Sequence, residues 1–241
     1  MSRKARRQPK YEIVSNETNI YQLNKKKPTK VNIIPRNKHQ EDYLVSLIDP
    51  KIDIVFAIGP AGCGKTIMAT QKAIKDFQEG RIEKIVITRP NVAVDDRDIG
   101  YLPGDILKKM TPWLKPILDV FEEYYSPKEI LALMEENIIE ACPIAFLRGR
   151  TFKNSIVLVD EAQGTTPNSM MAILTRIGEG SKMIVTGDLD QTDHHGPNGL
   201  SDFIGRFNNN SNRISVIRFN DKDVERHPVV KDVLRIYETD K

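Results

Sequence analysis

One motif organises this chain: Gly59-Pro60-Ala61-Gly62-Cys63-Gly64-Lys65-Thr66, which fits the phosphate-binding loop pattern of a glycine, four residues and then GK[ST]. Residues 54–58 are apolar and largely β-branched, so they predict a buried strand just ahead of the motif. The residues after it predict a helix that opens at Gly64 or Lys65, with a buried side made of Ile67, Ile74 and Phe77. A strand, a glycine-rich loop and a helix in this order predict a nucleotide site.

The residue types in this loop suit a phosphate chain. Gly59, Gly62 and Gly64 allow backbone N–H groups to close around phosphate oxygens, and the helix N-terminus adds the positive end of its dipole. Lys65 can reach the β- and γ-phosphates, and the hydroxyl of Thr66 can ligate Mg²⁺. The alternative is a glycine turn that binds nothing, and the flanking strand and helix disfavour it.

A second motif lies roughly ninety residues later. Residues 155–159 predict a buried strand, and Asp160 and Glu161 follow at its C-terminal end. In a parallel sheet this is the edge where ligands bind. We expect Asp160 to complete the Mg²⁺ coordination begun by Thr66, and Glu161 to orient or deprotonate the water that attacks a γ-phosphate.

Three further candidates for the site rest on weaker patterns. Asp188 and Gln191 follow another apolar strand, at 183–186, where a polar side chain can contact the γ-phosphate. Asn37 and Gln40 lie ahead of the phosphate-loop strand, where nucleic-acid-dependent ATPases often place an amide that reads adenine; an ordinary polar helix start explains them equally well. His194 and His195 lie near Asp190 and Asp193, but this spacing matches no standard zinc site.

Strands and helices alternate along the rest of the chain. Strands are expected at 84–88, 138–141 and 214–219, and helices at 38–47, 127–136, 229–237 and from Thr166-Pro167 onward. Pro103-Gly104 is typical of a turn that closes an ordered loop over 91–105. This alternation predicts an α/β fold: a single P-loop NTPase (RecA-like) domain with a mostly parallel sheet flanked by helices.

One helix in this series carries the only tryptophan of the chain. Trp113 stands in an apolar stripe with Leu114, Ile117, Leu118 and Phe121. An exposed tryptophan could stack on a nucleic-acid base, but the helical spacing favours a place in the core.

Composition and charge narrow the class of protein. The 241 residues are 39% hydrophobic and 29% charged, which suits one sizeable core. Residues 1–38 carry a net charge of +9 and the remainder a net charge of −6, so we expect a flexible basic arm over 1–36 and an ATPase domain over 37–241. The arm indicates a polyanion partner, with nucleic acid first, or a solubilising tail.

Nothing in the sequence predicts export or membrane insertion. No run approaches the roughly 18 apolar residues of a membrane span, and the basic N-terminus lacks the apolar segment of a secretory signal. Cys63 and Cys142 make no disulfide framework, and reduced cysteines indicate the cytoplasm, or the host cytoplasm if the chain is phage-encoded.

With these segments in place, the chain resembles the ATPase core of the PhoH family, in a compact phage-like form. The resemblance covers roughly residues 37–239. It rests on GPAGCGKT (59–66), ITRP (87–90), IGYLPGD (99–105), FLRGRTF (146–152), VLVDEAQ (157–163), TGDLDQ (186–191) and RHPVV (226–230).

That family is similar to the N-terminal motor domain of superfamily-one helicases. The resemblance therefore implies a protein that binds and hydrolyses ATP with Mg²⁺ and acts on RNA or single-stranded DNA. It implies that Gly59, Gly64, Lys65 and Thr66 are phosphate and Mg²⁺ groups, that Asp160 and Glu161 are the Walker B pair, that Asp188 and Gln191 are the sensor, and that Thr88 and Arg89 lie near the nucleic acid.

The chain also departs from this pattern. Cys63 stands where relatives often have threonine, although its backbone N–H serves equally. We expect neither the RNase (PIN) domain of some relatives nor a second motor domain in these residues, which makes unwinding by a monomer doubtful.

The sequence leaves the catalytic arginine open. An arginine on the transition-state charge often contributes about 10³-fold or more, and it commonly comes from a neighbouring subunit. Arg226 is the first choice, ahead of Arg148, Arg150 and Arg176. We therefore expect a homo-oligomeric ring, a hexamer as in relatives. Two alternatives to a polynucleotide-coupled ATPase are a slow nucleotide-gated switch and a small-molecule kinase. Glu161 in a catalytic position disfavours both.

Overall fold

The computed structural model describes residues 30–90, 103–191, 198–208, 210–225 and 229, and for residues 103–112 it describes the backbone. Within these ranges six strands form one sheet in which every pair is parallel, in the order β3-β2-β4-β5-β1-β6. The strands are β1 (Ile54–Ile58), β2 (Lys84–Thr88), β3 (Ile139–Ala141), β4 (Ser155–Val159), β5 (Lys182–Gly187) and β6 (Ile214–Arg218).

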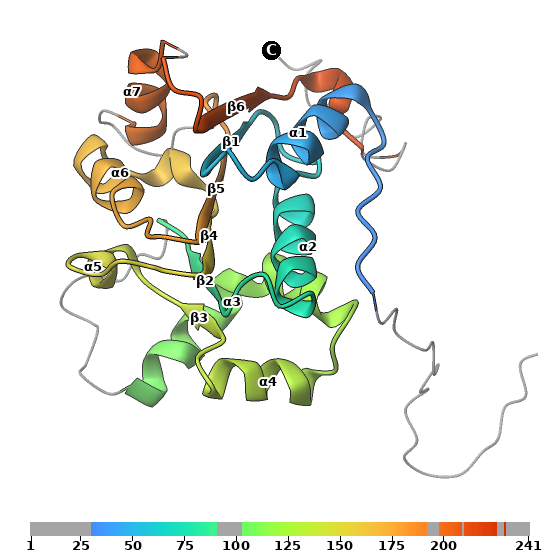
Figure 1. Ribbon diagram of the computed structural model, residues 1–241, viewed down its shortest axis with the longest axis vertical. Coiled ribbons are helices and arrows are strands. Elements are labelled where there is room, and N and C mark those ends of the chain that lie inside the picture. Colours follow the sequence, from blue (N-terminus) through green and yellow to red (C-terminus); the bar gives the residue numbers. More distant parts are fainter. Residues whose placement is uncertain (1–29, 91–102, 192–197, 209, 226–228, 230–241) are drawn as a thin grey trace, which may run out of the picture.

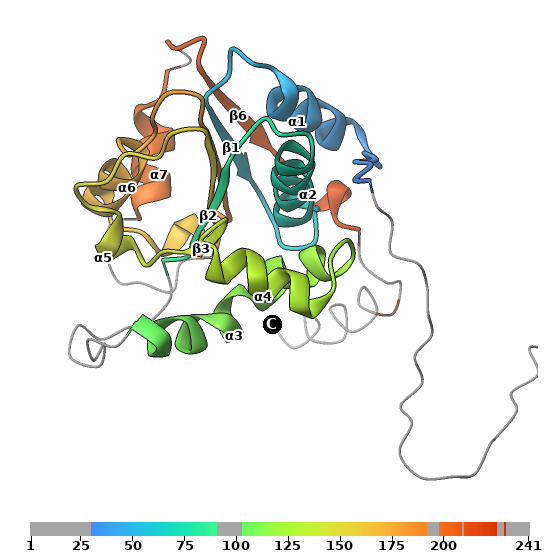
Figure 2. The ribbon, with the colours of Figure 1, turned by 60° about the horizontal axis from the view of Figure 1, so that its bottom comes forward.

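Helices cover both faces of the sheet, which agrees with the predicted fold class (Figures 1 and 2). One face carries α1 (Lys38–Ile48), α2 (Lys65–Gln78), α3 (Pro103–Glu122) and α4 (Pro127–Glu135). The other face carries α5 (Ile144–Leu147), α6 (Pro167–Leu174) and α7 (Gly199–Arg206). Short 3₁₀ turns lie at Ala162–Gly164 and Asp221–Asp223.

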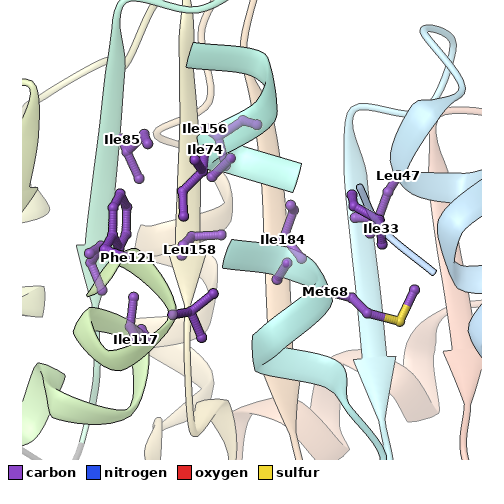
Figure 3. Close-up of a cluster of buried hydrophobic side chains, with 14 of the residues drawn as sticks. Ile33, Leu47, Met68, Ile74, Ile85, Ile117, Phe121, Ile156, Leu158 and Ile184 are labelled. Carbon is purple, nitrogen blue, oxygen red and sulfur yellow. The ribbon is translucent and has the colours of Figure 1, made fainter. Parts of the chain in front are cut away.

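The central strands are apolar on both sides because each side packs against helices. In β4, Ile156 and Leu158 point into the core under α2 and α3, whereas Val157 and Val159 point into the core under α6 and α7. Figure 3 shows the first of these cores, where Ile117 and Phe121 of α3 meet Leu158 beneath α2. Each such buried side chain contributes about 1.5–3 kcal/mol relative to exposure.

Local sequence signals set where several helices begin. The Asn37 side chain accepts a hydrogen bond from the backbone N–H of Gln40 at 2.9 Å and caps α1. Ser126 and Glu129 form a capping box at the start of α4. Thr166 caps α6 with Pro167 in the first turn, as predicted.

Three sequence expectations were wrong. Trp113 is 44% exposed, although Leu114, Ile117 and Phe121 of the same helix are buried as expected. Ile67 is 50% exposed, because Met68, Ala69 and Ala73 form the buried side of α2 instead. Pro103-Gly104 does not form a turn: Pro103 begins α3, a position where a proline lacks no needed hydrogen bond. Residues 91–102 of the expected loop lie outside the described residues.

The strand order sets the geometry of the predicted site. Strand β5 lies between β1, which leads into the phosphate loop, and β4, which leads into Asp160 and Glu161. Because all six strands are parallel, the C-terminal ends of β1, β2, β4 and β5 lie together at one edge of the sheet. The C-terminal end of the expected basic arm packs against the domain, because Val31 and Ile33 are buried in the core beside α1 and α2.

Candidate nucleotide-binding site

The glycine-rich loop between β1 and α2 has a backbone that other residues cannot adopt easily. Gly59 has φ +144°, and a Cβ atom there would lie 2.6 Å from the carbonyl oxygen of Phe219. Gly64 has φ +80° and is the N-cap of α2. Glycine supplies these conformations without steric cost, so the loop's residue types follow from its shape.

The outer side of the loop is held by neighbouring segments. The Gln40 Nε2 donates to the Cys63 carbonyl at 3.1 Å, and the Tyr43 hydroxyl donates to the Lys65 carbonyl at 3.3 Å. From the other end of the chain, the backbone N–H of Glu225 donates to the Gly62 carbonyl at 3.0 Å. The carbonyls of Gly62, Cys63 and Lys65 are therefore held by groups outside the loop, which fixes the backbone around the residues that would meet a phosphate chain.

Gln40 is almost fully buried beside this loop, and its side-chain oxygen accepts from the backbone N–H of Arg36 at 2.8 Å. It also lines a cavity of about 460 Å³, and Gly62 and Gly64 of the loop line the same cavity. The exposed side chains of Ile34 and Ile67 give that cavity apolar walls. The structure thus places Gln40 next to the phosphate loop, with its amide already joined to backbone on both sides.

Lys65 lies in the loop with its ammonium group turned toward the backbone. Its Nζ donates to the carbonyls of Gly59 at 2.6 Å and of Pro60 at 2.7 Å. Burial lowers the pKa of Lys65, while the neighbouring carboxylates of Asp188, Glu161 and Asp160 oppose that shift. The Lys65 ammonium group therefore lies close enough to the carboxylates that follow β4 and β5 to interact with them electrostatically.

Asp160 joins the loop to the sheet. Its Oδ1 accepts a hydrogen bond from the Thr66 hydroxyl at 2.8 Å and another from the Thr186 hydroxyl at 2.6 Å. Thr66 and Asp160 are 94 residues apart in sequence, and this hydrogen bond brings together the two residues expected to share the coordination of Mg²⁺. Hydroxyl and carboxylate oxygens are the ligand types that Mg²⁺ accepts, so the pair fits this ion.

Glu161 occupies a strained turn directly after Asp160. It has φ +55° and ψ +42°, a left-handed conformation that non-glycine residues adopt at some cost and that often marks a functional position. Its Oε2 accepts from Gln163 Nε2 at 2.5 Å, and its Oε1 lies 3.3 Å from Arg89 Nη2. The carboxylate therefore has a donor at each oxygen.

The end of β5 completes a cavity of about 210 Å³. Asp188 and Gln191 line it together with Lys65, Thr66, Asp160 and Glu161. The backbone N–H of Asp188 donates to Gln163 Oε1 at 3.2 Å, so Gln163 links Glu161 to the residues after β5. Pro60 and Cys63 belong to the same loop, and Ala61, Gly62 and Gly64 line this cavity as well.

The structure separates the arginine candidates. Arg150 donates to Glu140 Oε2 at 2.9 Å and lies over the ring of Phe152, and Arg176 donates to the carbonyls of Ala172 and Arg150. Arg148 is exposed and makes no hydrogen bond or ion pair with the part of the chain that the structure describes. Arg226 lies outside the described residues, as do His194, His195 and the expected helix from 230 onward.

Sequence reasoning missed three contributors to this site. The apolar pattern predicts Thr186 as a strand residue and assigns no role to Gln163, although each stands within a string that carries a stronger motif. The resemblance implies that Arg89 lies near nucleic acid, but no sequence pattern predicts its contact with Glu161. For Thr186 and Arg89 the available signal is a polar side chain at the C-terminal end of an otherwise apolar strand, whereas Gln163 lies in the turn that follows β4.

The described residues offer neither a cluster of metal-binding side chains nor a membrane-spanning helix. No group of three or more His, Cys, Asp or Glu side chains there could hold a metal ion. No described helix is long and apolar enough to cross a membrane. Cys63 and Cys142 are both free and buried, and burial raises the pKa of each thiol.

A parallel sheet with a phosphate loop after β1 and paired carboxylates after β4 defines the class: this is a P-loop NTPase fold. Comparison with known proteins gives the family. The model of the PhoH-like protein family matches residues 32–238. The chain belongs to the PhoH-like protein family.

Curated relatives agree with this assignment. The chain is 40% identical over 202 residues to a PhoH-like protein of Bacillus subtilis, covering 83% of this chain and 62% of that one. It is 40% identical over 201 residues to a PhoH-like protein of Synechocystis, covering 83% and 60%, and 35% identical over 209 residues to Protein PhoH of Escherichia coli K12, covering 85% and 58%. The chain thus spans about three fifths of the length of these relatives.

Among solved structures, the chain is similar to a Sulfolobus solfataricus SWI2/SNF2 ATPase core in complex with dsDNA. The likeness has a TM-score of 0.40 and 13% identity, and it covers 66% of this chain and 33% of that one. A likeness at this level is too loose to support an inference about function.

Proposed function

We propose that the chain binds ATP and hydrolyses it, and that hydrolysis is coupled to RNA or single-stranded DNA. The observation that carries the ATPase part is the meeting of Thr66 and Asp160 at 2.8 Å beside Glu161, within the cavity that Lys65 also lines. This brings a phosphate-binding loop, an oxygen pair suited to Mg²⁺ and a candidate base into one site.

Each residue then has a role in the proposed reaction. Lys65 exchanges the carbonyls of Gly59 and Pro60 for oxygens of the β- and γ-phosphates. Thr66 and Asp160 would hold Mg²⁺, which offsets phosphate charge when bound. Glu161 orients a water for attack on the γ-phosphorus and takes its proton; the bond to the β–γ bridging oxygen breaks, giving ADP and inorganic phosphate. Asp188 and Gln191 contact the γ-phosphate region and report its loss.

The base is proposed to occupy the neighbouring cavity beside Gln40. A primary amide has two N–H donors and an oxygen with two lone pairs, so its bonds to Cys63 and Arg36 leave one donor and one lone pair for adenine. The exposed side chains of Ile34 and Ile67 would pack against the faces of the ring.

The nucleic-acid part of the proposal rests on the basic arm and on the family resemblance. Polynucleotide stimulation of turnover tests it directly: steady-state ATP hydrolysis is measured alone and with poly(U) or single-stranded DNA, with Glu161→Gln as the control. We expect stimulation in the parent chain and loss of turnover with retained ATP binding in the variant. Turnover that ignores polynucleotide would remove the coupling and leave the ATPase.

A second candidate is a slow nucleotide-gated switch. The observation that favours it is the engagement of both Glu161 oxygens by Arg89 and Gln163. Tight ATP binding with negligible turnover in every condition would support the switch and contradict the motor.

The active form is proposed to be a ring in which a neighbouring subunit supplies an arginine. Arg148 and Arg226 remain the candidates, because Arg150 and Arg176 are bound within their own chain. Arg148→Ala and Arg226→Ala are compared in turn by sedimentation and turnover. A monomer with full ATPase activity would contradict the ring.

A further inference from the structure

The guanidinium of Arg89 lies between the Walker B carboxylates and helix α3. Its Nη2 is 3.3 Å from Glu161 Oε1, and its Nη1 is 4.0 Å from Asp160 Oδ2. The same Nη1 donates to the carbonyl oxygen of Trp113 at 2.8 Å. The Arg89 side chain thus contacts both a candidate catalytic residue and the backbone carbonyl of the exposed Trp113.

The hydrogen bonding of Arg89 is incomplete. Its Nε is buried and has no partner among the described residues. Its side chain is mostly covered, yet part of it stays open to solvent. A guanidinium presents a planar fork of donors that matches a phosphate in two-point fashion, and such a pair is stronger than one contact at 3.3 Å.

Trp113, whose backbone carbonyl accepts the hydrogen bond from Arg89, is 44% exposed. Leu114 and Ile117, on the same helix, are fully buried, so the helix buries its apolar stripe and leaves the largest apolar side chain out. A partly exposed tryptophan whose backbone carbonyl holds a guanidinium brings together the two kinds of group that bind single-stranded nucleic acid, because any base can stack on an indole ring and a phosphate can pair with the cation.

We propose that Arg89 is a positioning residue that couples single-stranded polynucleotide bound at Trp113 to the Glu161 carboxylate. This rests on the proposed function. A base stacks on Trp113 and a backbone phosphate takes the Arg89 guanidinium. Arg89 then leaves Oε1 of Glu161, which becomes free to face the attacking water. In the absence of polynucleotide, Arg89 and Gln163 together keep both oxygens of Glu161 engaged.

Trp113 provides a direct reading of the first step, because it is the only tryptophan in the chain. Its emission is measured while oligo(dT), poly(U) or inorganic polyphosphate is added to the full chain. We expect the two polynucleotides to quench the emission and polyphosphate, which has charge but no bases, to leave it unchanged. Comparison of the first two separates DNA from RNA as the source. Equal quenching by polyphosphate would contradict stacking.

Arg89→Gln tests the second step. The variant removes the contact of Arg89 with Glu161, which has the strength of a partly exposed ion pair. Turnover measured without polynucleotide should therefore rise about two- to fivefold. The factor by which polynucleotide stimulates turnover should fall to the same extent. Arg89→Lys keeps the charge but not the two-point fork, so it should return basal turnover toward the parent value and restore stimulation by polynucleotide only in part. Arg213→Ala is the matched control: Arg213 pairs with Asp53 at the opposite edge of the sheet, and its loss should change neither value.

The outcomes separate this inference from the proposed function. Trp113→Phe keeps a ring, so retained stimulation there with loss in Trp113→Ala supports stacking. If polynucleotide stimulates turnover without changing Trp113 emission, the coupling through Arg89 is overturned and the ATPase proposal stands. The same holds if Arg89→Gln lowers basal and stimulated turnover by one common factor. A chain that hydrolyses no ATP in any condition overturns the proposed function, and the coupling with it.

Discussion

Replacing Thr186 with valine should weaken both the fold and the metal requirement of the site, because it removes one hydroxyl and keeps the shape of the side chain. Thr186 is 3% exposed and Asp160 is 5% exposed, and the hydroxyl donates to Asp160 Oδ1 at 2.6 Å. A hydrogen bond to a charged group is worth about 1.5–3 kcal/mol, and no water can easily replace this one. The Thr66 hydroxyl still donates to the same oxygen. We therefore expect the free energy of unfolding to fall by about 2 kcal/mol.

The prediction is measured in two ways. With a urea dependence of about 2 kcal/mol per molar, the unfolding midpoint should fall by about 1 M. Thr186 also orients a carboxylate proposed to hold Mg²⁺, so half-maximal turnover should need about tenfold more Mg²⁺.

Thr175→Val is the control. Thr175 is exposed; its hydroxyl donates to the carbonyls of Met171 and Ala172 and accepts from Arg176 Nη2, all in contact with solvent, so this change should cost no more than about 0.5 kcal/mol. Equal midpoints for the two variants, with an unchanged Mg²⁺ dependence, would refute the role assigned to Thr186.

Two further predictions concern the loop and a buried lysine. Gly59→Ala should lower the free energy of unfolding by about 2–4 kcal/mol and impair ATP binding, because the added Cβ meets the Phe219 carbonyl in a backbone conformation that disfavours alanine. Gly80→Ala, with φ +67° and open space around it, should cost only about 1–2 kcal/mol, and similar losses in urea unfolding would contradict the steric argument. Lys182 donates to the carbonyls of Ser46, Asp49 and Ile52, and burial lowers its pKa to about 8 from 10.5. Above pH 8 the unfolded chain keeps a proton that the folded chain has lost, so stability relative to Lys182→Met should rise by about 2 kcal/mol between pH 8 and 9.5. If urea unfolding gives the same difference in free energy of unfolding between the two proteins at pH 8 and at pH 9.5, the lowered pKa of Lys182 is contradicted.

Local patterns predicted the elements well where they carried their own signals. The apolar run before Gly59 predicted β1, and Thr166-Pro167 predicted the start of α6, because caps and β-branched runs act through near neighbours. The same reasoning failed for Trp113 and Ile67. Helical spacing shows which residues share a face, but the packing of neighbouring elements decides how wide the buried face is.

The sequence alone determined the P-loop NTPase class and the residues expected to surround a phosphate chain, because the glycines, Lys65 and Thr66 form one continuous motif. It also predicted that Asp160 and Thr66 would serve one Mg²⁺ site. The contacts that Thr186, Gln163 and Arg89 make with these carboxylates become visible only in the folded chain. These contacts depend on the order β2-β4-β5-β1, which brings residues from different strand ends to one edge of the sheet. Strand order arises from the packing of the whole chain, and no local pattern encodes it.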